Sequence, residues 1–503
     1  MSELTEQEII RRESLRKIEE LGINPYPAEE FLTTTTTSEI KKEFSEEKNN
    51  FQNVRIAGRI MSRRIMGKAS FAEIKDQTGR LQLYLNRDEI CPGEDKTMYN
   101  DVFKKYLDIG DIIGVEGRCF VTKVGEKSVF VEKLTLLSKS IKPLPIVKTD
   151  AEGKSHDDFK DTELRYRQRS LDLIVNDGAW DVFEKRTKIF NSIRKALNEE
   201  GLMEVETPIL QPIAGGAAAR PFATHHNTLD IPLYLRIANE LYLKRLIVGG
   251  KKGVFEFAKD FRNEGMDRTH NPEFTMLEFY VAYKDYNWMM GFVEKMFEQT
   301  VKDVCGQTKI EYDGNKIEFK GPYKRLAFFD AIKEKTGDDI SKMNEDELVK
   351  YCKSKNIETN KSMGRGKLFD AVFGEFCEKE LIQPTYITDY PIEMSPLTKK
   401  HRSKEGLTER FELFINGKEI ANAYSEQNNP IEQRKSFEDQ MRLAEKGDDE
   451  AMLIDNQFLT ALEYGMPPTS GIGIGMDRLT MLLTNKKTIQ DVLFFPQMKP
   501  ENK

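Results

Sequence analysis

The sequence predicts an α+β multidomain protein in which a five-stranded β-barrel precedes a larger domain built on an antiparallel β-sheet flanked by helices. Three observations support this prediction. The chain has 503 residues, more than one hydrophobic core usually organises. Short runs of alternating apolar and polar residues fill positions 53–140, as in a small barrel. Two later stretches, 255–281 and 410–426, read as antiparallel hairpins.

Composition narrows the class of protein. The most hydrophobic stretch, 233–248, is broken by four charged residues, so we expect no membrane span. The first twenty residues hold six acids against four bases and no apolar signal region, which favours a cytoplasmic protein. The five cysteines form no C-x-x-C pair, so we expect free thiols and no zinc.

The N-terminal part divides into three segments. Residues 1–50 predict a helical extension, because Thr5 and Glu8 have the spacing of a capping box and Ile10, Ile18 and Leu21 fall near one stripe. Residues 51–142 predict the barrel, and 143–178 a linker that begins with the two prolines of IKPLPIV.

The barrel carries a local excess of positive charge. Between positions 53 and 80 there are seven bases and two acids, or 7 − 2 = +5, in a chain whose net charge is −7. Next to an outward-pointing ring such as Phe71, this charge suits single-stranded RNA, in which phosphates need cations and bases stack on aromatics. A solvated basic edge fits the same residues equally well.

The larger domain is expected over 179–503. Its first helix, 179–200, precedes the strand MEVETPIL, and both could belong to an ordinary core. The small-residue run GGAAARPF would let backbone approach a ligand closely. Residues from about 325 to 380 predict a helical insertion without catalytic residues.

The hairpin at 255–281 sorts its side chains by alternation. Leu277 and Phe279 face the expected core, while Phe274, Glu278 and Tyr280 share the opposite face. The preceding arm adds Arg262 and Glu264. This face could hold a planar base, a phosphate and a cation, although a solvated salt-bridge face is the simpler alternative.

The second hairpin turns at Asn416-Gly417. A two-residue turn pairs Phe414 with Glu419, and Glu412 with Ala421. Glu412 and Glu419 then become diagonal neighbours on one face, where they repel each other unless a cation such as Mg²⁺ lies between them. Two solvated strand carboxylates remain the alternative.

Three strings resemble the signature motifs of the class II aminoacyl-tRNA synthetases, in the lysyl, aspartyl and asparaginyl subgroup. FRNEG with HNPEFTMLEFY resembles motif 2 in its lysyl-type form, and GIGIGMDRLTMLL resembles motif 3. The helix and strand near residue 200 resemble motif 1, which forms the homodimer interface of that family. The barrel block is similar to the anticodon-binding OB-fold. The similarity extends from about residue 50 to the C-terminus, with one departure: Thr269 instead of arginine precedes His270, which leaves the role of Arg268 open.

The resemblance implies a lysine ligase: ATP activates L-lysine as lysyl-adenylate, pyrophosphate leaves, and lysine passes to the 3′ end of tRNA(Lys). It assigns Arg262, His270 and Arg478 to catalysis, and Mg²⁺ to Glu412 and Glu419. The ATP residues it implies are Arg262, Glu264, His270, Asn271, Phe274, Glu412, Glu419 and Arg478. The residues it implies for binding the lysine substrate are Gly216, Glu240, Glu278, Tyr280, Asn422, Tyr424 and Glu426. The anticodon residues it implies are Arg59, Phe71, Gln82 and Glu132.

Three other functions share parts of this pattern. An aspartyl- or asparaginyl-type enzyme has the same architecture but needs a cation or amide donors where this chain offers carboxylates. A lysine ligase for a non-tRNA acceptor would not need the basic barrel. A non-catalytic RNA-binding paralogue would lose the motif arginines or the metal carboxylates.

The second hairpin contains a conflict. Strict alternation directs Glu419 and Asn422 to opposite faces, whereas the resemblance places both in one active site. We therefore predict a β-bulge, with broken pairing at 420–422, because one extra residue reverses the facing of everything beyond it. Glu412, Glu419, Asn422 and Glu426 should then open into the same cleft.

Overall fold

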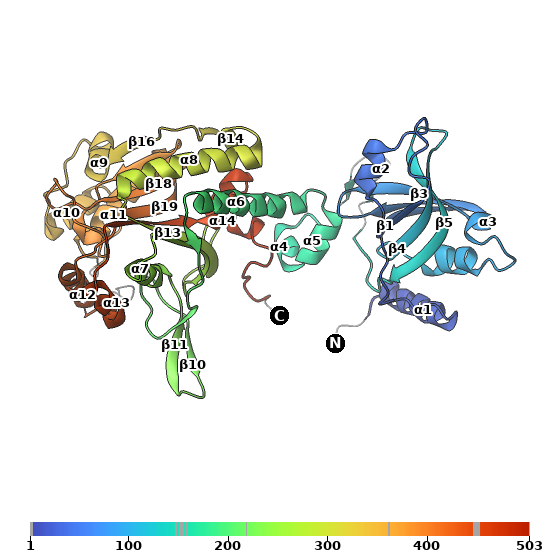
Figure 1. Ribbon diagram of the computed structural model, residues 1–503, viewed down its shortest axis with the longest axis horizontal. Coiled ribbons are helices and arrows are strands. Elements are labelled where there is room, and N and C mark those ends of the chain that lie inside the picture. The colour runs from blue at the N-terminus through green and yellow to red at the C-terminus, as the bar shows by residue number, and fades with distance from the viewer. Residues whose placement is uncertain are drawn as a thin grey trace. The chain divides into compact units, whose positions relative to one another are not determined.

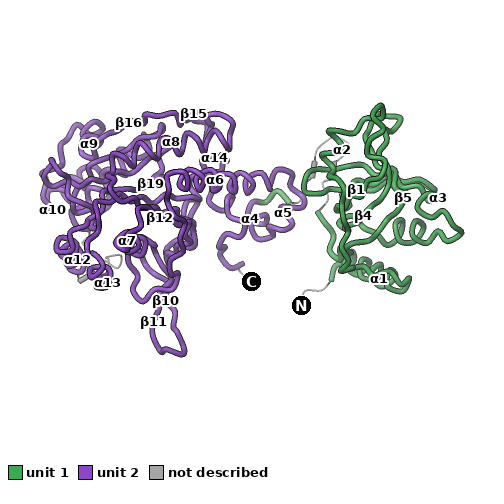
Figure 2. Tube along the Cα trace, viewed as in Figure 1, with its two compact units in different colours: residues 1–161 green, residues 162–503 purple. Residues whose placement is uncertain are grey.

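The computed structural model describes residues 4–145, 148–149, 155–156, 159–217, 219–360, 363–445 and 453–501. The chain forms two compact units, residues 1–161 and 162–503 (Figure 2). Residues 146–147, 150–154 and 157–158 of the predicted linker lie outside the described residues. The second unit includes residues 162–178, which the sequence analysis assigned to the linker.

The first unit is built on the expected five-stranded barrel. Its strands are β1 (Val54–Met66), β2 (Ala69–Lys75), β3 (Arg80–Asn86), β4 (Ile112–Val121) and β5 (Lys127–Ser138), closed in the order β1-β2-β3-β5-β4. Alternate residues such as Leu81, Leu83 and Leu85 are fully buried, while the residues between them reach the surface. The prediction of a closed barrel is therefore confirmed.

Short helices surround the barrel: α1 (Glu6–Glu20), α2 (Thr37–Glu43), α3 (Arg87–Ile90) and the π-helix η1 (Met98–Tyr106). The capping box of α1 is present. Its predicted apolar stripe is wrong at two positions, because Ile10 and Leu21 are exposed and only Ile18 is buried. Arg11 turns this side of the helix toward the barrel by donating to the carbonyls of Ile109 and Ser140.

An eight-stranded, mostly antiparallel sheet organises the second unit, in the order β16-β17-β18-β19-β20-β13-β12-β8. Only the two outermost pairings, β16 with β17 and β12 with β8, are parallel. The strands are β8 (Met203–Glu204), β12 (Gly253–Phe261), β13 (Glu273–Ala282), β16 (Lys324–Ala327), β17 (Thr385–Thr388), β18 (Arg410–Ile415), β19 (Lys418–Ser425) and β20 (Thr469–Gly475).

Helices cover both faces of this sheet (Figure 1). One face packs on α6 (Ala179–Glu199), α8 (Tyr286–Cys305) and α14 (Met476–Leu483) around a large apolar core. The other face packs at one end on α7 (Glu240–Val248), α12 (Pro430–Glu445) and α13 (Asn456–Glu463). The rest of that second face carries polar side chains.

Smaller elements complete the unit. The predicted insertion begins with the edge strand β16 and continues as α9 (Phe328–Thr336), α10 (Glu345–Ser354), α11 (Arg365–Phe376) and η2 (Glu378–Glu380) around a core of its own. Helices α4 (Thr162–Arg167) and α5 (Arg169–Val175) precede α6, and β14 (Lys309–Tyr312) pairs with β15 (Asn315–Glu318). The remaining short elements are β6 (Lys148–Thr149), β7 (Ser155–His156), η3 (Ile392–Met394) and η4 (Ile489–Asp491).

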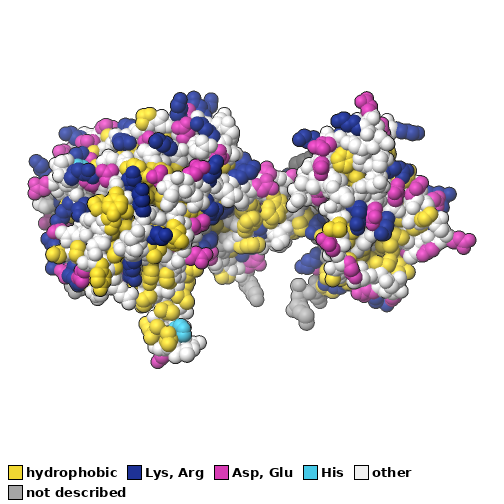
Figure 3. All heavy atoms as spheres, in the orientation of Figure 1, with side chains coloured by type: hydrophobic (Ala, Val, Ile, Leu, Met, Phe, Trp, Pro, Cys, Tyr) yellow, Lys and Arg dark blue, Asp and Glu magenta, His cyan; other side chains and the backbone are white. Residues whose placement is uncertain are grey.

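A separate three-stranded sheet projects from the second unit: β9 (Leu210–Gln211), β10 (Ala223–His226) and β11 (Ile231–Leu235). Hydrophobic and histidine side chains gather at its tip (Figure 3). The exposed apolar residues of this hairpin include Leu229 and Ile231. Within the described ranges no helix is both long and apolar enough to cross a membrane.

Candidate active site and nucleic-acid interface

The polar face of the large sheet is formed first by the hairpin β12–β13. The two strands pair without interruption from Gly253↔Val281 to Phe261↔Glu273. Leu277 and Phe279 are fully buried in the core, while Glu278 and Tyr280 lie on the opposite face, where the Tyr280 hydroxyl donates to Glu278 at 2.8 Å. The predicted alternation of this hairpin is confirmed.

Strand β20 supplies a floor without side chains. It pairs with β13 on one side and β19 on the other. Ile472 and Ile474 point into the core, so Gly471, Gly473 and Gly475 alternate onto the polar face. A Cβ added at Gly471 would lie 2.2 Å from Glu426 Oε1 and 2.3 Å from the Tyr280 ring. Glycine is required here because the neighbouring side chains occupy the space.

The predicted bulge is present in β19. Phe414 pairs with Glu419 as expected, but Leu413 pairs with Ala421, so Ile420 is the extra residue. Glu412 therefore pairs with Asn422, and the expected pairing with Ala421 is wrong because it ignored the bulge. Ile420 and Ala421 both point into the core. Only Ile420 is unpaired. Ala421 and Asn422, which the prediction included in the break, pair regularly with Leu413 and Glu412.

Positively charged side chains lie at one end of this face. The guanidinium of Arg262 stacks over the Phe274 ring at 5.1 Å, and its Nε has no hydrogen-bond partner among the described residues. Beside it, burial raises the pKa of Asp260 to about 6, against the opposing charges of Arg236 and Arg262. An arginine with uncommitted donors is suited to a phosphate.

Arg478 and His270 lie together near this end. Arg478 Nη2 is 3.1 Å from His270 Nε2, and its Nη1 donates to the Glu419 carbonyl at 3.0 Å. The other ring nitrogen of His270 is 2.8 Å from Asp267 Oδ2. Although partial burial opposes the shift, hydrogen bonds from His270 and Thr269 lower the pKa of Asp267. Asp267 thus holds the histidine toward Arg478.

The remaining residues of the β12–β13 loop have different surroundings. Glu264 and Arg268 are exposed. The side chain of Asn271 is buried. It donates to the Glu273 carbonyl at 2.6 Å and accepts from the backbone N–H of Gln497 at 3.2 Å. The side chain of Asn271 therefore fastens the loop to the C-terminal segment.

The hairpin β18–β19 brings two carboxylates toward the same face. Glu412 contacts the Arg410 guanidinium and accepts from the Tyr390 hydroxyl at 2.8 Å. Burial, opposed by Arg410 and reinforced by Glu419, raises the pKa of Glu412 to about 7. Arg410 also donates to the Asn422 side chain at 3.1 Å, so it connects Glu412 on β18 with Asn422 on β19.

The other end of the face is a cluster of buried carboxylates. Glu240, Glu278 and Glu426 are 5%, 6% and 2% exposed. The Tyr424 hydroxyl donates to Glu240 at 2.7 Å. Gly216, with φ +90°, lies beside the side chain of Glu240, since an added Cβ would be 3.5 Å from the Glu240 Cβ. All seven residues predicted to bind the lysine substrate thus lie on or beside this face.

The barrel offers a second functional surface. Phe71, Tyr84 and Phe130 are cross-strand neighbours on the outer faces of β2, β3 and β5, with ring centroids 5.2 and 5.3 Å apart in succession. Gln82 lies in the next row and donates to Ser128 at 2.9 Å, while Glu132 follows Phe130 on β5 and contacts Arg118. This half-exposed aromatic row can stack unpaired bases.

Arg59 does not join the other predicted anticodon residues. It pairs across β1 and β2 with Lys75, two rows away from Phe71 and Tyr84. Its guanidinium donates to the Gly110 carbonyl at 2.6 Å within the barrel.

Sequence reasoning missed several residues of these surfaces. Tyr84 could have been found from the alternation of RLQLYLN, which points it outward beside Gln82. Lys244 stands out as a charge inside the apolar run LYLKRLIV, one helical turn after Glu240. Arg410 lies two residues before Glu412 on the same strand, where alternation places both on one face, whereas Tyr390 gave no local signal because only the folded sheet brings it to Glu412.

The sequence is similar to known protein families in both of the regions that carry these surfaces. Residues 161–499 match the family described as tRNA synthetases class II (D, K and N), and residues 54–137 match the OB-fold nucleic acid binding domain. The barrel is therefore an OB-fold, and the sheet unit carries the class II synthetase domain.

Full-length relatives narrow the assignment. A lysine–tRNA ligase of Porphyromonas gingivalis is 63% identical over 99% of this chain and 86% of that protein. One from Christiangramia forsetii is 64% identical over 100% of this chain and 88% of its own length, and one from Azobacteroides pseudotrichonymphae is 59% identical over 99% of both. The chain belongs to the class II tRNA synthetase family, in its lysine–tRNA ligase branch.

Proposed function

We propose that the protein activates L-lysine with ATP and transfers it to tRNA(Lys). The observation that carries this proposal is the division of one glycine-floored face into a cationic end and a carboxylate end. A buried ammonium needs carboxylate partners, and a triphosphate needs arginines. An aspartyl- or asparaginyl-type enzyme would need cations or amides in place of Glu240, Glu278 and Glu426.

In this proposal, charge and position carry the rate, since no protein nucleophile is required. The lysine carboxylate attacks the α-phosphorus of ATP and pyrophosphate leaves; the terminal hydroxyl of tRNA then attacks the carbonyl carbon of the adenylate, and AMP leaves. Arg262 neutralises the α-phosphate and Arg478 with His270 the outer phosphates. Phe274 stacks on adenine, and Glu264 accepts from its amino group.

The second hairpin fits Mg²⁺ by its donor chemistry. Glu412 and Glu419 are hard oxygen donors, and the charge of Glu419 helps to raise the pKa of Glu412. The described residues contain no group of three or more such ligands, so nucleotide oxygens and water would complete the coordination. Bound there, Mg²⁺ supplies charge neutralisation on the phosphates.

Lysine-dependent exchange of pyrophosphate into ATP tests this function. When each of the twenty amino acids is tested separately at low concentration, we expect that lysine is the one amino acid that supports exchange. Exchange driven by aspartate or asparagine would overturn the assignment, and so would lysine activation without charging of tRNA(Lys).

We further expect Phe71→Ala to impair tRNA charging and to leave pyrophosphate exchange intact. Loss of one stacking ring costs about 1 to 3 kcal/mol in RNA binding, so the KM for tRNA should rise about 5- to 150-fold. Phe31→Ala, which removes another ring of the same unit that lies over Arg55, serves as the control. Equal losses in charging and exchange would contradict an anticodon role.

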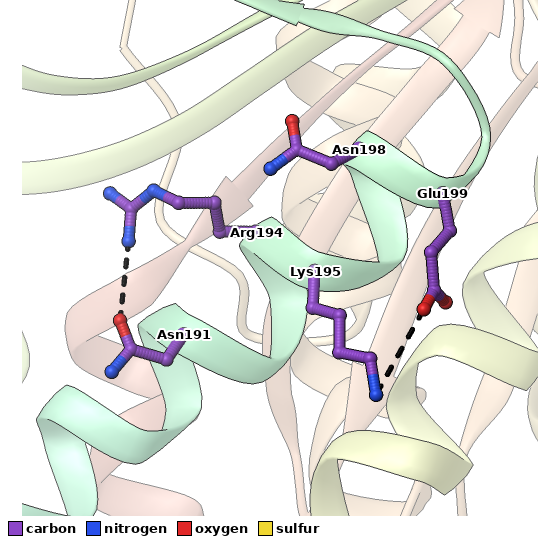
Figure 4. A pocket seen from close by; sticks show the side chains of 5 residues that line it. All are labelled: Asn191, Arg194, Lys195, Asn198 and Glu199. Atoms are coloured by element: carbon purple, nitrogen blue, oxygen red, sulfur yellow. Dashed lines mark hydrogen bonds and ion pairs between the residues drawn. The ribbon is translucent and has the colours of Figure 1, made fainter.

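We also propose a cytoplasmic homodimer formed through α6 and β8. The short strand β8 ends the large sheet, and Met203, Ile209 and Leu210 beside it are 49%, 43% and 48% exposed. Along α6, Asn191, Arg194, Lys195, Asn198 and Glu199 line a shallow polar hollow (Figure 4). Light scattering should give twice 58.1 kDa, and a monomer at micromolar concentration would contradict this assembly.

A further inference from the structure

A lysine of the chain itself lies inside the carboxylate cluster. The Lys244 side chain is 0% exposed, and its Nζ contacts Oε1 of Glu240 and Oε2 of Glu426. The ring centroids of Tyr424 and Phe458 lie 5.5 and 5.8 Å from this ammonium. A buried cation is stable only when it is neutralised, so Lys244 and the two carboxylates form one charged unit.

The two carboxylate oxygens of Glu426 face different groups: one faces Lys244, and the other faces the glycines of β20. While Oε2 faces Lys244, Oε1 lies over Gly471, as the 2.2 Å approach of an added Cβ shows. Oε1 is buried and accepts no hydrogen bond from the described residues. Lys244 thus orients a carboxylate whose second oxygen is available to a cation on the floor.

The charges of the cluster can be counted. When all three are ionised, the carboxylates of Glu240, Glu278 and Glu426 carry three negative charges against the single positive charge of Lys244, which leaves two negative charges. Free lysine carries two ammonium groups, and in the function proposed above its carboxylate faces the α-phosphorus of ATP instead of the cluster. The residual charge of the cluster therefore equals the number of ammonium groups on the substrate.

We propose that Lys244 is a positioning and specificity-determining residue for the amino acid. Its ammonium neutralises one of three carboxylates, fixes Glu240 and Glu426 in place, and leaves the charge that a doubly ammonium-bearing substrate requires. This inference rests on the proposed function, in which lysine is the substrate of the cluster.

Titration of Glu426 distinguishes this role from simple packing. The charged or titratable groups around it are Lys244 and Glu240 from α7, Glu278 and Tyr280 from β13, and Tyr424 from β19. Burial raises the pKa of Glu426 to about 8, and Lys244 opposes this effect. Loss of Lys244 must raise the pKa further, so a higher pH is needed to ionise the carboxylate that receives the substrate ammonium.

The first test is Lys244→Met, assayed by pyrophosphate exchange from pH 6 to 9. We expect the KM for lysine to rise at least tenfold, the KM for ATP to change less than threefold, and the acidic limb of kcat/KM for lysine to move to higher pH. Arg245→Met is the matched control, because Arg245 lies on the same helix but pairs with Asp455 at 2.5 Å outside the cluster. An unmoved acidic limb, or the same shift in Arg245→Met, would overturn the proposal.

A second arm does not depend on the stability of Lys244→Met. Glu426→Gln alone leaves one net negative charge in the cluster, and adding Lys244→Met restores two. The double variant should therefore have a lower KM for lysine than Glu426→Gln, and an equal or higher value would refute the charge balance. If the native protein showed no lysine-dependent exchange, the proposed function would fail instead, whatever the variants did.

Discussion

Replacing Arg262 by lysine should slow lysyl-adenylate formation by about 100-fold or more, the loss typical when one preorganised charge is removed from a transition state. Lysine keeps a positive charge beside Asp260 but loses the planar fork that can bind two phosphate oxygens. Single-turnover formation of lysyl-adenylate, followed with labelled ATP, measures this step directly.

Lys259→Met is the control for Arg262→Lys. Lys259 lies on β12, the strand that Arg262 directly follows; its side chain points to the opposite face and makes a 3.4 Å ion pair with the exposed Glu273. We expect its exchange rate to stay within about twofold of the native rate, as for most surface substitutions. If Arg262→Lys retained native single-turnover rates, Arg262 would not contact the reacting phosphate.

Gly471→Ala should raise the KM for lysine by about 100-fold, or abolish lysine activation. The added methyl would lie 2.2 Å from Glu426 Oε1 and 2.3 Å from the Tyr280 ring, and both side chains are enclosed. Overpacking of this kind costs about 1 to 3 kcal/mol in stability, and it displaces the oxygen that faces the substrate. The KM for ATP should change far less, since Gly471 lies at the carboxylate end of the floor.

Gly475→Ala isolates the steric effect. It has the same parity on β20, but its added Cβ would meet nothing closer than 3.7 Å. Thermal unfolding should therefore show a lower midpoint for Gly471→Ala and a nearly native midpoint for Gly475→Ala. A native KM for lysine in folded Gly471→Ala would show that the amino acid does not lie on this part of the floor.

The fold was predictable where one periodicity dominated. Alternation in 255–281 and in the barrel strands identified both hairpin faces and the closed sheet, because one face of each strand is buried. The stripe of the N-terminal helix was mistaken because Arg11, a charged residue, makes the buried contact through three backbone carbonyls. Long-range hydrogen bonds of this kind leave no pattern in the local sequence.

The candidate site was predictable mainly through motifs, and its missing members follow a rule. Lys244 and Arg410 each neutralise predicted carboxylates from the interior side. A motif identifies groups that meet a ligand, whereas contacts such as that of Lys244 with Glu426, or of Tyr390 with Glu412, depend on how elements distant in the chain pack. The bulge at Ile420 was the exception, because two requirements on one strand were incompatible without it.

The bulge also determines how the two substrates are aligned. Glu419, assigned to the nucleotide, and Asn422, assigned to the amino acid, belong to one strand and are separated by the extra residue. A regular strand advances about 3.4 Å per residue, whereas a reacting pair tolerates a misplacement of about 1 Å before the rate falls 100-fold. In the proposed function, Ile420 is therefore the spacer that aligns the attacking carboxylate with the α-phosphorus, and inserting or deleting one residue in this strand should leave both substrates able to bind while stopping the reaction.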